Sequence, residues 1–183
     1  GDVTCKSFPI KAYYELHIEQ GPVLENENTS IGVVTGGQGS VWTHINLYGQ
    51  GAHAGTTPMD YRKDPMMGAS RIITELREII RSHSAAVGTV GRLETYPASI
   101  NSIPGSLFFT VDTRHPNEKV LMKINQDLKN IVNTVCSAEG LENEFTNISI
   151  NPTVKFNQDC VATVRQSANS LGYSHRDIVS GAG

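Results

Sequence analysis

The chain has 183 residues, of which 38% are hydrophobic and 18% charged, and its formal net charge is -3. These values are typical of a folded protein with one domain or two small ones. They exclude the strongly basic surface of a nucleic-acid-binding protein, and no apolar run approaches the ~18 residues of a membrane span. We therefore expect neither nucleic acid nor a membrane as a partner.

The three cysteines, Cys5, Cys136 and Cys160, are too sparse for a disulfide framework and lack zinc-finger spacing. We interpret them as reduced structural thiols and expect a cytoplasmic protein. The amino-terminal residues lack the basic and apolar regions of a signal peptide. The small-residue run Ser180–Gly183 ends the chain without a terminal helix, so we expect a fragment of a longer protein.

The first predicted element is a buried strand at residues 12–17, which is aromatic and apolar and is broken by Gly21 and Pro22. A second apolar run at residues 31–35 leads into Gly36-Gly37-Gln38-Gly39, a sequence that indicates a domain boundary. Beyond Pro152, the pattern predicts a helix and then a short strand at residues 176–179.

The middle of the chain alternates between strand and helix patterns. Strands are predicted at residues 41–47, 87–96, 107–113 and 145–150, because apolar and polar residues alternate there. Helices begin near Asp64, with Pro65 at the first position, and near Asn117, with Gly140 as a cap. The order strand, helix, strand, strand, helix, strand predicts a ferredoxin-like βαββαβ fold of the α/β (α+β) class, an antiparallel sheet with two helices on one face.

His17 follows the first predicted strand, and strand ends are where catalytic and metal-binding groups collect in α/β sheets. Imidazole is the most common transition-metal ligand, and flanking carboxylates such as Glu15 and Glu19 can orient it. The alternative is a buried structural histidine with Glu19 in the first turn of a helix.

His53 lies in a loop of small residues, which let a ligand approach closely. A histidine held there could donate a hydrogen bond to a developing oxyanion, and the alternative is an ordinary tight turn. We expect Arg62 and Asp64 to form an ion pair that fixes the loop. Asn101 and Arg114 together could hold a carboxylate, since the planar guanidinium matches both oxygens, or each could be a structural residue at a turn or strand end.

Five motifs occur in a fixed order along nearly the whole chain. They are Glu15–Pro22, Gly51–Met59 with Arg62 and Asp64, Asn101–Gly105, Asp112–Arg114 and Ser180–Gly183. In this order they resemble the hydantoinase/carbamoylase family, which includes N-carbamoyl-L-amino acid hydrolase, β-ureidopropionase and allantoate amidohydrolase. The resemblance implies that residues 37–151 are a dimerisation or lid domain inserted between two pieces, residues 1–36 and 152–183, of an α/β metal-dependent aminopeptidase-like catalytic domain.

The resemblance also implies a role for each motif residue. His17 matches a ligand of one of two divalent metal ions, zinc or manganese, and His53 matches the lid histidine that polarises the scissile carbonyl, usually in the partner subunit's site. The other matches are contacts to the substrate. They are Gln20, the carboxylate clamp Asn101 and Arg114, and the backbone of Gly183.

The activity that this resemblance implies is hydrolysis of the C–N bond of an N-carbamoyl (ureido) amino acid by a homodimer. The family's upstream segment of metal ligands and catalytic glutamate is absent, as is the histidine that follows Ser-Gly-Ala-Gly, so we expect the chain alone to be inactive. An allantoate amidohydrolase, or a related aminoacylase or peptidase, remains an alternative. A non-catalytic dimerisation module is an alternative of another class.

Overall fold

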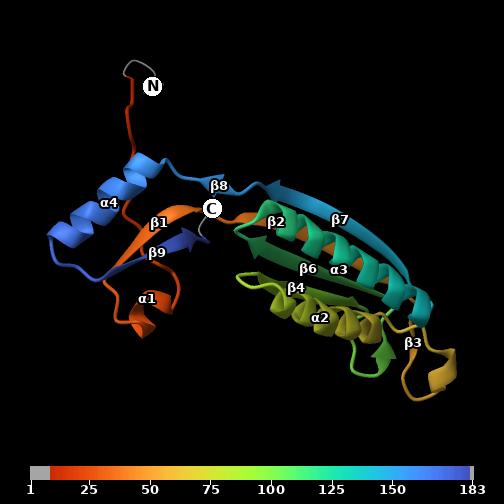
Figure 1. Ribbon diagram of the computed structural model, residues 1–183. Helices are drawn as coiled ribbons and strands as arrows, with labels where there is room; N and C mark the ends of the chain where they lie inside the picture. The colour runs from red at the N-terminus through yellow and green to blue at the C-terminus, as the bar shows by residue number, and fades with distance from the viewer. Residues whose placement is uncertain (1–8, 182–183) are drawn as a thin grey trace, which may run out of the picture. The chain divides into compact units, whose positions relative to one another are not determined.

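The computed structural model describes residues 9–181, which divide into two compact units (Figure 1). One unit contains residues 9–36 together with Lys155–Ser180, and the other contains Gly37–Val154 together with Gly181. Within the described range, no helix is long and apolar enough to cross a membrane.

The second unit is a four-stranded antiparallel sheet with two helices on one face (Figure 1). The strand order is β4-β6-β2-β7, so β4 and β7 are the edges. The predicted ferredoxin-like arrangement is confirmed. The elements are β2 (Gly39–Tyr48), α2 (Pro65–Ser82), β4 (Val87–Tyr96), β6 (Ser106–His115), α3 (Glu118–Glu139) and β7 (Glu142–Asn151).

The alternation of side chains along β2 explains why one face of the sheet is covered. Val41, Ile45 and Leu47 are fully buried under the helices, whereas Trp42 on the opposite face is 46% exposed. Register pairs Ile45 with Phe109 of β6, which is also fully buried. Because strand side chains alternate with period two, this pairing fixes which face meets α2 and α3.

Local signals start and stop the two helices at the predicted places. The Asp64 carboxylate accepts a hydrogen bond from the backbone of Met66, and Asn117 caps α3 in the same way. Gly140 ends α3 at a φ of 65°, in the left-handed region where only glycine fits without strain.

The face of the sheet without helices carries polar and aromatic side chains. His44 and Phe108 pack edge to face with centroids 5.0 Å apart, and the Arg92 guanidinium lies 5.2 Å from the Phe108 ring centroid. Asp112 and Arg114 of β6 share this open face, since they alternate with buried Val111 and Thr113. The candidate residue Arg114 therefore lies on the face of the sheet that the helices leave uncovered.

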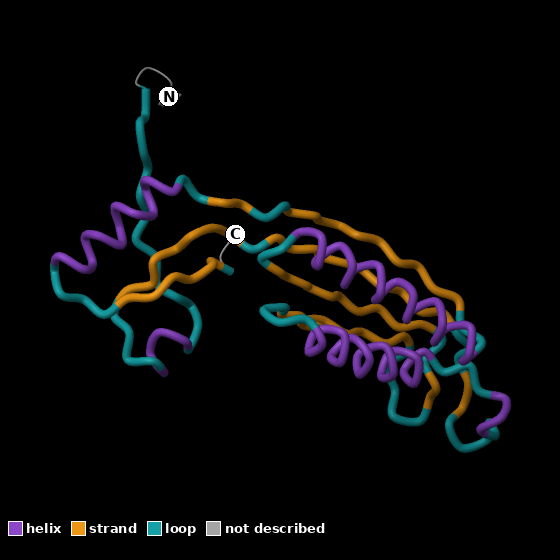
Figure 2. Tube along the Cα trace, viewed as in Figure 1, coloured by secondary structure: helices purple, strands orange, loops and turns teal. Residues whose placement is uncertain are grey.

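The first unit contains a three-stranded sheet of order β8-β1-β9. The predicted strand and helix after Pro152 are both present. The predicted strand at residues 12–17 is wrong, because residues 9–20 form no strand and Leu16 is 99% exposed (Figure 2). An apolar segment forms a stable strand only where a neighbouring strand accepts its hydrogen bonds, and residues 9–20 pair with none of the three strands of this sheet. The elements are α1 (Val23–Asn26), β1 (Ile31–Gly37), β8 (Val154–Lys155), α4 (Gln158–Ser170) and β9 (His175–Ser180).

Candidate functional site

The loops that carry His53 and Asn101 are joined by a short two-stranded ladder. β3 (Ala52–His53) pairs with β5 (Ser102–Ile103), which places His53 opposite Ser102. The backbone N–H of Ala54 donates to the carbonyl of Asn101 at 2.9 Å. The structure therefore brings His53 and Asn101 together, as two neighbouring positions in one loop assembly.

The His53 imidazole is exposed, but its orientation and tautomer are fixed from within the loop. The backbone N–H of Gly55 donates to Nδ1 at 3.1 Å, and the Thr57 hydroxyl donates to the His53 carbonyl at 2.8 Å. Because a backbone N–H can only donate, Nδ1 must accept, and the proton of the neutral ring lies on Nε2. His53 thus offers Nε2–H as a donor, as the oxyanion role requires.

Arg62 holds this loop in a way that the sequence did not predict. Its Nε donates to the carbonyl of Thr57 at 3.0 Å and its Nη2 to the carbonyl of Ala54 at 2.8 Å. The expected ion pair with Asp64 is wrong, because the Asp64 carboxylate caps α2 instead. A helix amino terminus leaves backbone donors without partners, and a carboxylate at the N-cap satisfies one of them.

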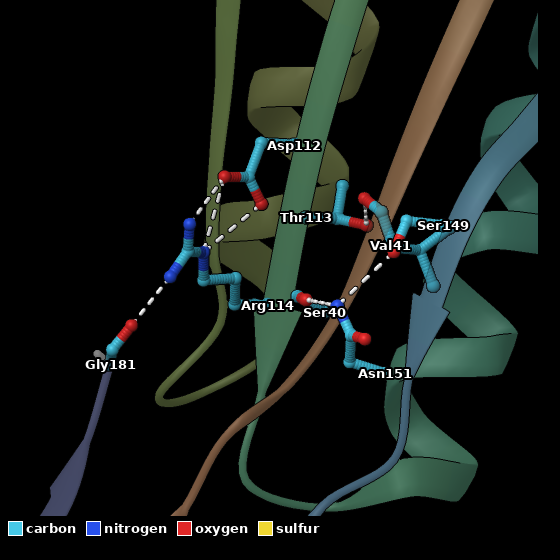
Figure 3. A network of polar contacts seen from close by, with 8 residues as sticks. All are labelled: Ser40, Val41, Asp112, Thr113, Arg114, Ser149, Asn151 and Gly181. Carbon is cyan, nitrogen blue, oxygen red and sulfur yellow. Dashed lines mark hydrogen bonds and ion pairs between the residues drawn. The ribbon is translucent and has the colours of Figure 1, made fainter. Parts of the chain in front are cut away.

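Arg114 lies on the open face with its guanidinium held by Asp112 (Figure 3). Nε donates to both Asp112 oxygens at 3.1 and 3.2 Å, Nη2 donates to Oδ2 at 2.7 Å, and Nη1 donates to the Gly181 carbonyl at 2.5 Å. These hydrogen bonds to Asp112 raise the pKa of Arg114 above its ordinary value, while partial burial acts in the opposite direction. Of the five guanidinium hydrogens, one on each of Nη1 and Nη2 remains, which suffices for two bonds to a ligand carboxylate.

Asn101 and Arg114 lie at opposite ends of β6. Gly105 is tied to the carbonyl of Tyr96, so the Asn101 loop stays beside the Ser106 end of the strand. From Ser106 to Arg114 there are eight residue steps, or roughly 26 Å at the usual rise per residue. Figure 1 shows β3 beyond one end of the sheet and the end of β6 at the other. One protomer therefore does not bring Asn101 and Arg114 to the same carboxylate.

His17 lies in the irregular segment before α1, where its ring is exposed. Its Nδ1 contacts the carbonyl of Ile18 at 2.5 Å. Since a carbonyl only accepts, Nδ1 carries the proton and Nε2 keeps a lone pair, which is the form that binds a metal. The expectation that a flanking carboxylate orients the ring is wrong, because Glu19 accepts from the backbone of α1 and Glu15 from the hydroxyl of Tyr13.

Gln20 has a φ of 52°, a left-handed conformation that is unusual for a residue other than glycine. Asn28 and Ala85 also have positive φ, so the conformation does not single out Gln20, and its substrate contact stays a prediction. The expected contact at Gly183 lies outside the described residues.

In the described part of the chain, no three His, Cys, Asp or Glu side chains gather into a metal-binding group. These residues therefore do not fit a two-metal centre by themselves, although His17 fits one ligand.

One supporting residue was missed from the sequence, and another was given the wrong partner. Asp112 was part of a motif but had no role assigned, although spacing of two residues on a strand places it beside Arg114 on one face. Arg62 was assigned to the wrong partner. Its true partners are backbone carbonyls, for which the sequence contains no direct signal.

Comparison with known proteins gives the family. The profile of the peptidase dimerisation domain matches residues 35–139. An N-carbamoyl-L-amino-acid amidohydrolase of Pseudomonas sp. (strain NS671) is 39% identical over 180 residues, covering 95% of this chain and 42% of that protein. The allantoate amidohydrolase of Escherichia coli (strain K12) is 37% identical over 175 residues, covering 95% of this chain and 43% of that protein.

Among solved structures, an amidase of the hydantoinase/carbamoylase family from Burkholderia multivorans matches with a TM-score of 0.95 and 47% identity, over 100% of this chain and 45% of that one. The chain belongs to the hydantoinase/carbamoylase amidase family, and it contains that family's peptidase dimerisation domain. It spans less than half the length of the curated relatives that it matches.

Proposed function

We propose that this chain is the dimer-forming and substrate-clamping part of an enzyme that hydrolyses the C–N bond of an N-carbamoyl amino acid. The observation that carries the proposal is that two side chains, one in a loop and one on a strand, present free hydrogen-bond donors. His53 presents an Nε2–H donor, and Arg114 keeps one hydrogen on each terminal nitrogen. Relatives with 37–39% identity are amidohydrolases of N-carbamoyl-L-amino acids and of allantoate.

The two positions suit the two halves of a ureido acid. Resonance makes the ureido carbon a poor electrophile, so a donor fixed where negative charge develops lowers the barrier. His53 would supply that hydrogen bond from Nε2. Arg114 would bind the distant carboxylate, and the binding energy would position the ureido group for attack.

A complete site would need two copies of the chain. One protomer holds His53 and Asn101 about a sheet's length from Arg114, so one small substrate does not reach all three. In a two-fold dimer, each site would take Arg114 from one subunit and His53 with Asn101 from its partner. Gln20, and Gly183 at the end of the chain, would complete the substrate contacts.

The edge strand β4 is the proposed meeting point of the two copies. β4 pairs with β6 on one side only, and unpaired edges invite pairing with another chain. Leu93 is in register with buried Phe109, on the face toward the helices, and is nevertheless 42% exposed. A second copy against β4 and α2 would cover this apolar surface together with Met67, which is 51% exposed.

Two divalent ions, zinc or manganese, would supply the activated water when bound. His17 would give one nitrogen ligand, and the remaining ligands would come from parts of the protein outside this chain. The 183-residue chain by itself would then be inactive. Residues 1–36 and 152–183 would belong to the catalytic domain, and a cytoplasmic location remains a prediction.

Allantoate amidohydrolase is the second candidate, because the Escherichia coli relative is almost as similar as the carbamoyl-amino-acid hydrolases. The test is an assay of the full-length protein containing this chain, loaded with zinc or manganese, on N-carbamoyl-β-alanine, N-carbamoyl-α-amino acids and allantoate. Hydrolysis of an N-carbamoyl amino acid with the highest kcat/KM is expected. Preference for allantoate would favour the second candidate, and turnover of none would favour a non-catalytic dimerisation module.

A further inference from the structure

Arg62 connects the two ends of the turn that begins at His53. Its two hydrogen bonds end on Ala54 and Thr57, so the guanidinium closes a ring with the backbone of residues 54–57. Within the same turn, the backbone N–H of Gly55 donates to Nδ1 of His53, and the Thr57 hydroxyl donates to the His53 carbonyl. All four hydrogen bonds are between 2.8 and 3.1 Å long.

We propose that Arg62 is a positioning residue for His53: by tying the carbonyls of Ala54 and Thr57 together, it keeps the Gly55 N–H on Nδ1 and so keeps the proton on Nε2. The inference rests on the proposed function only in making Nε2–H the donor to substrate. The hydrogen-bonded loop itself belongs to the chain regardless of its activity.

The turn fits closely around the imidazole, which makes the donor sensitive to small shifts. A methyl group added at Gly55 would lie 3.2 Å from Cε1 of His53, which is tighter than most contacts of this kind. Loosening the turn would let the ring rotate and let Nδ1 take the proton, which would remove the outward donor. The orientation of the imidazole therefore depends on the hydrogen bond from the Gly55 N–H, and that bond depends on the conformation of the turn.

Arginine suits this task better than lysine. Nε and Nη2 lie on one edge of a planar group, and they reach two carbonyls at the same time. A lysine at this position would present a compact ammonium without the planar fork, so it would not fix the separation of the two carbonyls. The partly buried side chain also borders a cavity of about 270 Å³, together with Asp64 and Ser102. A guanidinium ion from solution can enter such a space when the side chain is removed.

The first test is nuclear magnetic resonance on the 183-residue chain and does not depend on any activity. The ring ¹⁵N signals of His53 in the wild type should show the Nε2–H tautomer, with the Gly55 amide protected from exchange. In Arg62→Ala, the ring signals should move toward the tautomer mixture of a solvated histidine, and the Gly55 amide should exchange at least about tenfold faster. Thr57→Val should give a smaller change in the same direction, and Arg165→Ala should give none.

An Nδ1–H tautomer in the wild type would overturn the inference, and so would wild-type ring signals and Gly55 exchange in a folded Arg62→Ala protein. These results do not depend on whether the full-length protein hydrolyses ureido acids, so failure of the proposed function is recognised separately. A purely structural role would destabilise the whole unit, which the exchange of buried amides in β6 would reveal.

The second test uses the full-length enzyme once a substrate is known. Arg62→Ala should lower kcat about tenfold to a hundredfold with KM changed less than about twofold, because misplacement of a transition-state donor affects the chemical step. Added guanidinium should restore a large part of kcat in Arg62→Ala and none in His53→Ala. Arg62→Lys should lie between the wild type and Arg62→Ala. An unchanged kcat in Arg62→Ala, or an increase in KM alone, would contradict the positioning role.

Discussion

His17 and His53 use Nδ1 in opposite ways. Nδ1 of His53 accepts from the Gly55 backbone at 3.1 Å, whereas Nδ1 of His17 donates to the Ile18 carbonyl at 2.5 Å. The outward nitrogen therefore carries a proton in His53 and a lone pair in His17. Contacts with the local backbone therefore leave an N–H donor on the outward nitrogen of His53 and a lone pair on that of His17.

Arg114→Lys should impair substrate use in the full-length enzyme. Lysine keeps the charge but loses the paired hydrogens that orient a carboxylate. Loss of one charge-assisted hydrogen bond is worth about 1.5–3 kcal/mol, or roughly a tenfold to hundredfold rise in KM. Steady-state kinetics would measure the change.

Arg165 provides a matched control for that substitution. It also holds a carboxylate through Nε and Nη2, that of Asp177, at 2.8–3.2 Å. Arg165→Lys should leave KM close to that of the wild type. Equal effects of the two substitutions would indicate that Arg114 is a structural strand-end residue.

His53→Ala should have a different kinetic signature. If His53 donates to an oxygen that becomes negative only in the transition state, its loss lowers kcat more than it changes KM. Removal of one such donor in other enzymes typically costs about a hundredfold to a thousandfold in kcat. A rise in KM at constant kcat would mean that His53 contributes to ground-state binding instead.

The sequence predicted the sheet well because its signals are local and repeated. From Val41 onward the residues of β2 alternate between the core and the open face, and Asp64, Asn117 and Gly140 mark helix ends within one turn. The segment around His17 was predicted as a strand from the same kind of apolar pattern. That prediction failed because a strand also needs a neighbour, and a single segment does not reveal whether an edge is available.

The site could be predicted only as a set of residue types. Motifs indicated His53, Asn101 and Arg114, but their grouping depends on the register of β6, which places Arg114 at the far end from Asn101. The bonds of Arg62 to backbone carbonyls leave no mark in the sequence. These bonds of a side chain to backbone carbonyls five and eight residues earlier in the chain were the part that required the structure.

Phe109→Ala should destabilise the unit built on the four-stranded sheet by about 3–5 kcal/mol, because it opens a cavity in a fully buried core. Urea unfolding followed by the fluorescence of Trp42, the single tryptophan, would measure the loss. Ile100→Ala serves as the control, since Ile100 is 104% exposed and its removal should change the free energy of unfolding by less than about 0.5 kcal/mol. A similar loss from both would place Phe109 outside the core.

Cys136 should resist alkylation in the folded protein. It is 1% exposed, and burial raises its pKa above the ordinary thiol value, so less of the reactive thiolate is present at a given pH. Peptide mapping after iodoacetamide treatment at pH 8 should find Cys160, which is partly exposed, modified well before Cys136. The rate at Cys136 should rise with pH and on unfolding. Rapid modification of Cys136 at neutral pH would contradict its position in the core.

The central claim is that each site combines Arg114 of one subunit with His53 of the other, and subunit mixing tests it most directly. Full-length Arg114→Ala and His53→Ala proteins, each nearly inactive, are unfolded, mixed in equal amounts and refolded with metal. Random pairing makes half of the dimers mixed, and each mixed dimer has one intact site, so about a quarter of the wild-type activity should return. If the mixture stays as inactive as its two parents although mixed dimers are present by mass spectrometry, both residues act within one subunit and the account is wrong.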